Sequence, residues 1–372
     1  MFAMPGGVPP GSWPVRTYVT SRSSDKLDPA IRNRLYPRTR LGSYIKMRMA
    51  QLLLGDVQQL AERWLAKVIR QWRPDVIHTL GLDPAAFFYY RVRRKYDVTR
   101  IGKWVVTARG GPELTLKRLI PEDRERIEEV LLSCDQFIAD NQQNYGHAID
   151  LGLHPDKRAT IGAVPGTGGV DIDELSNLRK EPTSRSRIIL FPKAYECPAS
   201  KALPIFEALL LCWNKIEPCK IYLTAMIPET IMWLQTLPKE IREHCHARNR
   251  IPREELLELM AGSRVLLIPS LTDGLPNTLF EAMATGSFPI LSPIDTIQGV
   301  VQTEKNVLFA RNLYPQDIAD ALVRAMTDDE LVDRAAKRNL ELVKRLADRN
   351  TIRMKVTNYY QNIAAHGRSV NS

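Results

Sequence analysis

The segment LLIPSLTDGLPNTLFEAMATGSFP, residues 266–289, decides the fold that we expect of this chain. Its apolar start predicts a buried strand over Val265–Pro269, and a turn-rich loop follows over Ser270–Asn277. The apolar pattern after the loop predicts a helix that ends at Gly286. A loop that leaves the carboxyl end of a strand and opens into a helix is where α/β proteins bind anionic ligands, because the first amides of the helix face the ligand.

Two carboxylates in this segment, Asp273 and Glu281, flank Gly274 and Pro276. Glu281 is placed to take a pair of ribose hydroxyls, and Asp273 to reach a sugar. The amides expected to face a phosphate belong to Asn277, Thr278 and Leu279.

Simpler interpretations of the same residues remain open. Thr278 and Glu281 fit a capping box, in which Glu281 does no more than close the start of the helix. Asp273 followed by Gly274 is a common turn pair.

Taken together, these residues resemble the donor-site signature of retaining GT-B glycosyltransferases of glycosyltransferase family 4. That signature runs from Pro-Ser through an acid, Gly and Pro to Glu-Ala-Met-Ala-x-Gly, and its second acid stands eight positions after the first. Here the first acid is Asp273, which is one methylene shorter than the usual Glu. The resemblance implies an α/β, GT-B fold, in which two Rossmann-like domains face each other across a cleft. It also adds Gly274, Leu275 and Pro276 to the donor-binding residues.

The composition is that of an ordinary globular protein, with 44% hydrophobic and 25% charged residues among 372. This length suffices for two domains with full cores. No run of 18 apolar residues predicts a transmembrane helix, and the N-terminal sequence does not have the pattern of a signal peptide.

The five cysteines are scattered and lack CxxC spacing, which indicates reduced thiols in a cytoplasmic protein. His244-Cys245-His246 has no second cluster at ligand spacing, so we expect a surface helix end there and no metal site.

The net charge of +10 is unevenly distributed. Residues 1–120 hold 22 Lys and Arg against 8 Asp and Glu, densest over Arg16–Arg48 and again over Arg91–Lys95. A basic half predicts an anionic partner such as a lipid surface, although a merely solvated basic surface is the alternative. No nucleic-acid-binding motif accompanies the charges.

Strand-like and helix-like segments alternate along the whole chain, which predicts parallel, doubly wound sheets. Before residue 183 the expected strands are 75–80, 103–109, 135–139 and 160–165, and the expected helices are 44–72, 83–96 and 121–132. A polar stretch over 177–187 indicates a linker. The alternation then resumes with strands at 187–191, 220–226, 264–269 and 288–292, and helices at 202–213, 254–261 and 278–285.

We expect an acceptor-side domain over 1–182 and a nucleotide-sugar domain over 183–350. By the resemblance, a last helix over 351–372 returns to the first domain.

The resemblance assigns further donor contacts. Lys193 and Lys201 follow the strand RIILF, where the family has an Arg and a Lys on the donor pyrophosphate. The family's Gly after the second cation is Ala202 here. The backbone near Ile251 is expected to lie against the nucleotide base.

Two residues of the first half are candidates for the reaction centre. Arg109 stands where many relatives have a His near the donor sugar, and it stays protonated, so it could bind an anion but not act as a base. His78 lies near the end of a predicted strand, a position from which it is expected to point toward the cleft. A lone His in a strand is, however, more often a core residue. Gly166, Gly168 and Gly169 resemble the family's turn before Val-Asp. We discount the DxD pattern at Asp171 and Asp173 as a metal site.

The family's first strand, glycine loop and helix have no counterpart here, since Met1–Met4 resembles the end of the second strand. We therefore expect weak or no activity from this chain. The function expected is retaining, metal-independent hexosyl transfer, without a cofactor, from a UDP- or GDP-sugar to a lipid-linked or polysaccharide acceptor in cell-envelope synthesis. It would take place in the cytoplasm, with a peripheral position at the inner membrane face. The alternative is a nucleotide-sugar-binding regulatory relative without transfer activity.

Overall fold

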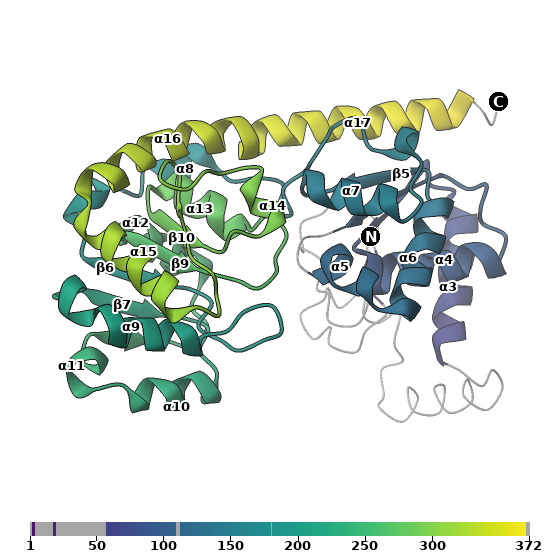
Figure 1. Ribbon diagram of the computed structural model, residues 1–372. Coiled ribbons are helices and arrows are strands. Elements are labelled where there is room, and N and C mark those ends of the chain that lie inside the picture. Colours follow the sequence, from purple (N-terminus) through teal and green to yellow (C-terminus); the bar gives the residue numbers. More distant parts are fainter. Residues whose placement is uncertain (1, 4–17, 20–56, 109–111, 180, 370–372) are drawn as a thin grey trace, which may run out of the picture. The chain divides into compact units, whose positions relative to one another are not determined.

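The fold is described from a computed structural model, which covers residues 2–3, 18–19, 57–108, 112–179 and 181–369 (Figure 1). The chain divides into two compact units. The first consists of Met1–Thr107, Arg126–Phe137 and Asn362–Ser372, and the second of Ala108–Glu125 and Ile138–Gln361. No helix of the described residues is long and apolar enough to cross a membrane.

The first unit holds a three-stranded sheet in the order β3-β4-β5. Its strands are Val76–Leu80, Lys103–Ala108 and Gln136–Ala139, and β3 runs parallel to β4. Its helices are α3 (Val57–Trp72), α4 (Phe87–Lys95) and most of α6 (Pro121–Ser133), whose first residues, up to Glu125, belong to the second unit. A separate parallel pair joins β1 (Phe2–Ala3) to β2 (Tyr18–Val19).

Trp104 on β4 is the centre of packing in the first unit, because its side chain is fully buried and its indole N–H has a partner. That N–H donates to Thr79 Oγ1 at 3.1 Å, and the edge of the ring meets Tyr89 with 5.1 Å between centroids. Asp135 accepts the Trp104 backbone N–H at 2.8 Å. The start of β5 is thereby fixed to β4.

The second unit is built on a six-stranded parallel sheet in the order β11-β10-β9-β6-β7-β8. The strands are β6 (Ile188–Phe191), β7 (Lys220–Leu223), β8 (Cys245–Ala247), β9 (Val265–Ile268), β10 (Phe288–Leu291) and β11 (Leu308–Phe309). This is the doubly wound Rossmann order. The chain winds outward from β6 in one direction and from β9 in the other, so the loops after these two strands diverge and leave a crevice.

Alternate residues of these strands pack on opposite faces of the sheet, as the two-residue period of a strand requires. Ile189 and Phe191 belong to a core formed with α9 (Leu203–Ile216) and α15 (Pro315–Thr327). Leu190 belongs to a second core, formed with α13 (Asn277–Thr285) and the end of α16 (Asp329–Ala347). Strands buried on both faces account for the continuous apolar runs of the sequence.

The remaining helices are short connections, except for α17 at the end of the chain. They are α5 (Pro112–Thr115), α7 (Gln142–Asp150), α8 (Ile172–Ser176), α10 (Pro228–Thr236), α11 (Lys239–Arg242), α12 (Arg253–Gly262), α14 (Asp295–Gln298) and α17 (Arg349–Ser369). Single turns of 3₁₀ or π helix lie at 82–86, 117–119, 155–157 and 183–185.

The structure differs from the sequence predictions in places. Residues 160–165 form no strand, since Gly162 takes a positive φ of 76° and Val164 makes a single backbone bond to Ala139 instead of a ladder. At His244-Cys245-His246 the expected helix end is only the turn at His244 after α11, and Cys245 and His246 belong to the edge strand β8, in which His246 stacks on Tyr222 of β7 at 4.8 Å. Aromatic pairing across neighbouring strands favours the extended form there.

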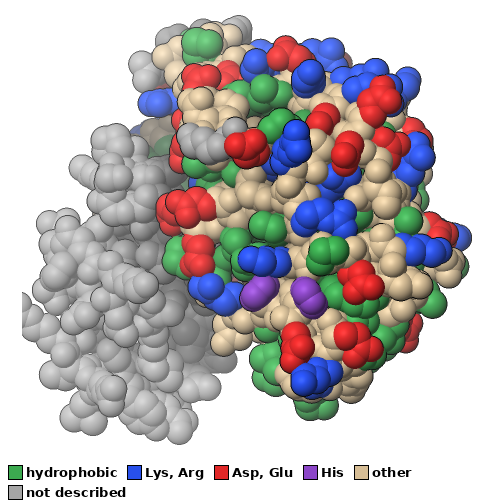
Figure 2. Space-filling model, turned by 90° about the vertical axis from the view of Figure 1, so that its left-hand side faces the viewer, with side chains coloured by type: hydrophobic (Ala, Val, Ile, Leu, Met, Phe, Trp, Pro, Cys, Tyr) green, Lys and Arg blue, Asp and Glu red, His purple; other side chains and the backbone are tan. Residues whose placement is uncertain are grey.

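One face of the second unit carries interspersed Lys, Arg, Asp and Glu side chains, so neither sign of charge dominates it (Figure 2). Salt bridges between neighbours on its helices fit this pattern, such as Arg334 with Glu330 at 2.8 Å and Lys239 with Glu243 at 3.6 Å. Exposed pairs of this kind contribute little to stability.

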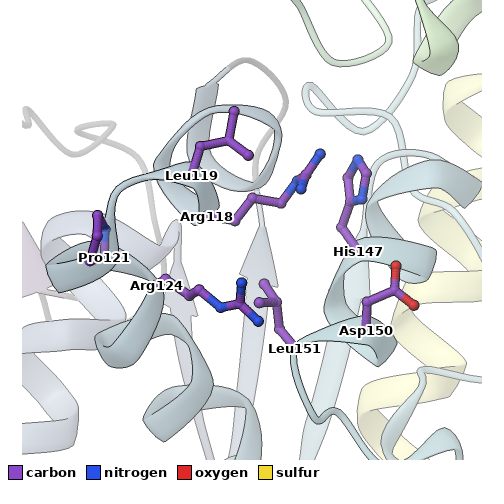
Figure 3. Close-up of a pocket in the computed structure, with 7 residues that line it drawn as sticks. All are labelled: Arg118, Leu119, Pro121, Arg124, His147, Asp150 and Leu151. Atoms are coloured by element: carbon purple, nitrogen blue, oxygen red, sulfur yellow. The ribbon is translucent and has the colours of Figure 1, made fainter.

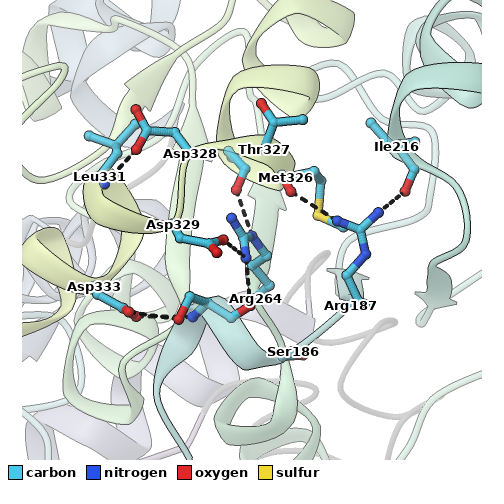
Figure 4. A network of polar contacts seen from close by, with 12 residues as sticks. Ser186, Arg187, Ile216, Arg264, Met326, Thr327, Asp328, Asp329, Leu331 and Asp333 are labelled. Carbon is cyan, nitrogen blue, oxygen red and sulfur yellow. Dashed lines mark hydrogen bonds and ion pairs between the residues drawn. The ribbon is translucent and has the colours of Figure 1, made fainter.

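A buried arginine cluster closes the second unit at the amino ends of its strands (Figure 4). Arg264, which is only 1% exposed, donates to the carbonyls of Ala325 and Ser184, each at 2.7 Å. Arg187 donates to the carbonyls of Met326 at 2.9 Å and of Ile216. These guanidiniums satisfy helix-end carbonyls that would otherwise be buried without partners.

We therefore expect Arg264→Gln to lower the free energy of unfolding by about 2–4 kcal/mol, because two buried carbonyls lose a charged donor. The matched control, Arg334→Gln, removes only an exposed pair and should change stability by less than about 0.5 kcal/mol. Urea denaturation followed by circular dichroism measures both. Equal losses in the two variants would contradict a structural role for the cluster.

Candidate functional site

The candidate site lies at the crevice of the Rossmann sheet, where the loop after β6 (residues 192–202) meets the loop after β9 (residues 269–276). The backbone N–H of Leu271 donates to the carbonyl of Ala199 at 2.8 Å, which holds the loops together. Ser200 Oγ donates to the carbonyl of Pro269 at 3.3 Å. Residues predicted as donor contacts from distant parts of the sequence are therefore neighbours.

Lys193 and Asp273 join the two loops through an ion pair of 2.9 Å. Burial alone would lower the pKa of Lys193, but the charge and hydrogen bond of Asp273 outweigh it and hold that pKa above its ordinary value. The other oxygen of Asp273 accepts the N–H of Gly274 at 2.9 Å, as in an Asp-Gly turn. Asp273 therefore makes the turn of the simpler interpretation and also holds a cation at the crevice.

Lys201 is paired with Glu196 of its own loop, at 3.3 Å. The same carboxylate accepts the N–H groups of Ala202 at 2.6 Å and Leu203 at 3.2 Å, where α9 begins. The amino end of a helix beside a lysine favours binding of an anion. In this protein the carboxylate of Glu196 is bound there, which the sequence did not predict.

The start of α13, in contrast, has no side-chain cap within the described part of the chain. Leu279 N–H bonds to the carbonyl of Pro276 at 3.0 Å. Glu281 pairs with Arg253 at 2.8 Å, so it does not act as the carboxylate of a capping box. The capping-box alternative is therefore wrong, and Glu281 is a largely covered carboxylate at the same end of the sheet.

Asp140 is a site residue that the sequence analysis missed. It follows β5, is 2% exposed, and its Oδ2 accepts the N–H of Leu275 at 3.3 Å. Its Oδ1 accepts the side-chain amides of Asn141 and Asn144, each at 2.8 Å. Burial raises the pKa of Asp140 and the nearby charge of Asp273 adds to this, while the bonds from Asn144 and Leu275 oppose it. A single carboxylate after the end of a strand belongs to no sequence motif, so nothing in the sequence indicated Asp140.

The glycine turn before Val170 packs on the junction of α16 and α17. A Cβ on Gly169, whose φ is 88°, would lie 2.4 Å from the carbonyl oxygen of Ala347, so only glycine fits. Asp171 caps α8 by accepting the N–H of Glu174 at 3.1 Å, which explains the first acid of the DxD pattern. Within the described ranges, no three His, Cys, Asp or Glu side chains are grouped as metal ligands.

The turn also contacts the start of α13. Thr167 Oγ1 donates to Asn277 Oδ1 at 2.9 Å, and its backbone N–H donates to the same oxygen at 3.3 Å. The side chain of Asn277 is thus held away from its own helix amides. Ile251, the expected neighbour of a base, lies half-buried in the loop between β8 and α12.

His78 lies on β3 in the first unit and shares a 2.7 Å hydrogen bond with Thr107 Oγ1. Although it keeps exposed surface, burial among protein atoms lowers its pKa to about 4. Arg109 lies outside the described residues, as does the basic stretch 16–48.

Each cation of the second basic run, on α4, pairs with a carboxylate of a neighbouring segment. Arg91 and Lys95 both pair with Glu62, at 3.2 and 3.4 Å, and Arg94 pairs with Glu129 at 3.4 Å. Arg93 lies 3.6 Å from Asp135. This run is therefore part of the packing of the first unit and supports no anionic partner by itself.

Comparison with known proteins agrees with this geometry. Residues 233–341 match the family described as "Glycosyl transferases group 1". The matched segment contains the loop after β9, Glu281 and α13. No curated protein sequence matches the chain.

Solved structures share the fold over most of the chain. The Anabaena protein HepE in complex with UDP-glucose matches with a TM-score of 0.62 and 14% identity, covering 80% of this chain and 81% of that one. Sucrose-phosphate synthase of Thermosynechococcus elongatus matches with 0.63 and 16%, covering 81% and 78%. A UDP-forming α,α-trehalose-phosphate synthase of Burkholderia xenovorans matches with 0.61 and 18%, covering 82% and 78%. The fold is GT-B, as predicted, and residues 233–341 match a glycosyltransferase family.

The lowered pKa of His78 has a direct spectroscopic consequence. Because the pKa of His78, about 4 in the folded protein, lies below the ordinary histidine value of 6.5, the imidazole should stay neutral from pH 8 down to about pH 5. The stability that depends on the neutral form is complete above pH 6.5 and is lost as the pH falls toward 4. Nitrogen-15 NMR of the histidine rings, assigned with His78→Gln, tests this. A titration midpoint near 6.5 would show that burial does not control this side chain.

Proposed function

We propose that the chain is a retaining, metal-independent hexosyltransferase that uses a UDP- or GDP-sugar as donor and a lipid-linked or polysaccharide acceptor in cell-envelope glycan assembly. One observation carries the proposal: two lysine-bearing and carboxylate-bearing loops meet at the switch point between β6 and β9, beside the uncapped start of α13. This is where doubly wound sheets bind nucleotides. That HepE was solved with UDP-glucose supports a UDP-sugar in the same place.

The proposed donor contacts follow from the geometry of the crevice. Lys193 and Lys201 take the diphosphate together with the amides of residues 277–279, and Glu281 takes the ribose hydroxyls. Asp273 takes sugar hydroxyls, with Gly274, Leu275 and Pro276 lining the loop. The backbone at Ile251 lies against the base.

The proposed chemistry needs charge stabilisation on the leaving group. As the bond from the sugar C1 to the diphosphate breaks, negative charge grows on that oxygen, and preoriented amides and lysines stabilise it without reorganisation. The acceptor hydroxyl attacks C1 on the same face, and a phosphate oxygen of the departing diphosphate takes its proton. The configuration at C1 is therefore retained.

We place the acceptor on the half of the chain that includes Arg109 and His78, within a domain of residues 1–182. The donor domain would comprise residues 183–350, and the segment 351–372 would return to the first. The excess of Lys and Arg in residues 1–120 supports an anionic acceptor at a membrane surface. We expect the chain in the cytoplasm, peripheral to the inner membrane face.

A second candidate function is binding of a nucleotide sugar without transfer, in a regulatory role. It is favoured by Glu196, because this carboxylate already accepts the N–H of Ala202 at the start of α9 and forms an ion pair with Lys201. Both candidates bind the donor, but only the first releases UDP or GDP when an acceptor is present. A coupled assay of nucleotide release on membrane lipids separates them, and sustained turnover would exclude the second.

If Glu281 holds the ribose, Glu281→Ala should weaken UDP-sugar or GDP-sugar binding about tenfold or more, the loss expected for a charged hydrogen-bond acceptor. A thermal-shift screen of UDP-, GDP- and ADP-sugars followed by calorimetry measures this. The matched control is Glu254→Ala, an exposed acid at the start of α12. An unchanged affinity in the Glu281 variant would remove this residue from the site.

If Glu196 competes with the diphosphate, Glu196→Gln should tighten UDP binding severalfold, because the neutral amide leaves Lys201 and the α9 amides available to phosphate. The control is Glu207→Gln, an exposed position on α9, which should have no effect on UDP binding. Calorimetric titration with UDP compares the three proteins. Weaker binding in the Glu196 variant would mean that this carboxylate supports the site instead of competing for it.

A further inference from the structure

A cavity of about 500 Å³ lies in the second unit, between the segment from residue 118 to the start of α6 and the end of α7. Its lining combines three kinds of side chain: cations, a carboxylate with an imidazole, and an apolar wall. They are Arg118, Arg124, His147, Asp150, Leu119, Pro121 and Leu151. A cavity of this size is in the range of small-molecule sites. None of these residues was a candidate from the sequence.

The charged side chains converge on the same space (Figure 3). The guanidinium of Arg118 points toward the ring of His147, and that of Arg124 points toward Leu151 and the side of Asp150. Two guanidiniums and one carboxylate line the cavity. Guanidinium groups are suited to bidentate recognition of phosphate oxygens.

Arg118 carries the clearest sign of a missing ligand. Its Nε is buried and has no hydrogen-bond partner among the described residues. A buried N–H without a partner costs free energy comparable to a lost hydrogen bond, and such a group in a native fold usually meets water or a ligand. An acceptor oxygen in the cavity would satisfy it.

The positive charge of Arg118 also affects the pKa of His147. Burial lowers its pKa, and the charge of Arg118 lowers it further, against the opposing effect of Asp150 and Asp295. A neutral imidazole can accept or donate one hydrogen bond to a ligand hydroxyl.

We propose that this cavity binds a phosphate monoester, with Arg118 and Arg124 on the phosphate, Asp150 and His147 on neighbouring hydroxyls, and Leu119 and Leu151 against its carbon skeleton. The site is separate from the donor contacts. It is connected to them through α7, which begins two residues after Asp140, the residue that accepts the N–H of Leu275. If the proposed transfer reaction holds, the ligand is a phosphate-bearing acceptor. Binding itself does not depend on that function.

The experiment uses the full chain and glycerol 3-phosphate as probe, titrated by calorimetry, with glycerol as the uncharged control. Arg118→Gln should weaken binding at least tenfold, which is the loss expected for a charged hydrogen bond. Arg118→Lys, which keeps the charge but not the fork, should lie between that variant and the original protein. Arg126→Gln, an exposed position on α6 outside the cavity lining, should stay within twofold.

A background variant separates this proposal from the donor site. In Lys193→Gln/Lys201→Gln, binding of UDP should fall while binding of glycerol 3-phosphate persists. Loss of probe binding in this variant would move the phosphate to the donor loops and overturn the proposal. So would equal affinities of the Arg118→Gln and original proteins, once unfolding curves show that both are folded.

A second arm identifies the source of the phosphate. Cosedimentation with phosphatidylcholine vesicles containing phosphatidic acid, compared with phosphatidylcholine alone, tests a lipid phosphate. Binding of these vesicles that is lost in Arg118→Gln indicates a lipid ligand, whereas binding of the soluble probe alone indicates a soluble phosphate ester. Binding of neither overturns the proposal.

Discussion

The reversal of strand order between β6 and β9 is the constraint on which the site depends. Parallel strands must be connected by crossovers, and these go to opposite sides once the winding direction changes. The loops after β6 and β9 therefore leave one sheet edge in different directions, and each leads into a helix. The ion pair of Lys193 with Asp273 and the hydrogen bond from Leu271 to Ala199 join the two loops.

In the second unit the sequence predicted strands β6, β7, β9 and β10 and helices α9, α12 and α13, because their apolar runs end at turn residues. β9, for example, is buried at every position, and Gly286 ends α13 with a φ of 78°. It failed where a contact between distant segments decides the structure. Residues 177–187 have the composition of a linker, yet Arg179 donates to Thr285 O at 2.7 Å and Thr183 to Gly286 O at 2.6 Å. These hydrogen bonds join segments about 100 residues apart, so no local sequence pattern predicts them.

The candidate site was predictable to a similar extent. Asp273 and Glu281 were predicted from the loop chemistry of their segment, and Lys193 and Lys201 from the family resemblance. The structure brings Lys193 to within 2.9 Å of Asp273. The other partners of these residues were not predicted, since Glu196, Arg253 and Asp140 belong to no motif and act through positions fixed only in the fold. A sequence pattern can identify which residues favour an anion, but it cannot show which anion of the protein already lies beside them.

Those partners change the energetics of binding. At Lys193, Lys201 and Glu281, every charge expected to contact the donor is already paired within the protein. A ligand therefore exchanges one ion pair for another and gains only the difference. A diphosphate has more oxygens and more charge than a single carboxylate. In the proposed site it would engage both lysines and the α13 amides at once, which neither Asp273 nor Glu196 does alone. The internal pairs thus satisfy the charges of the two loops, and they would favour a ligand that bridges both loops over one that reaches a single lysine.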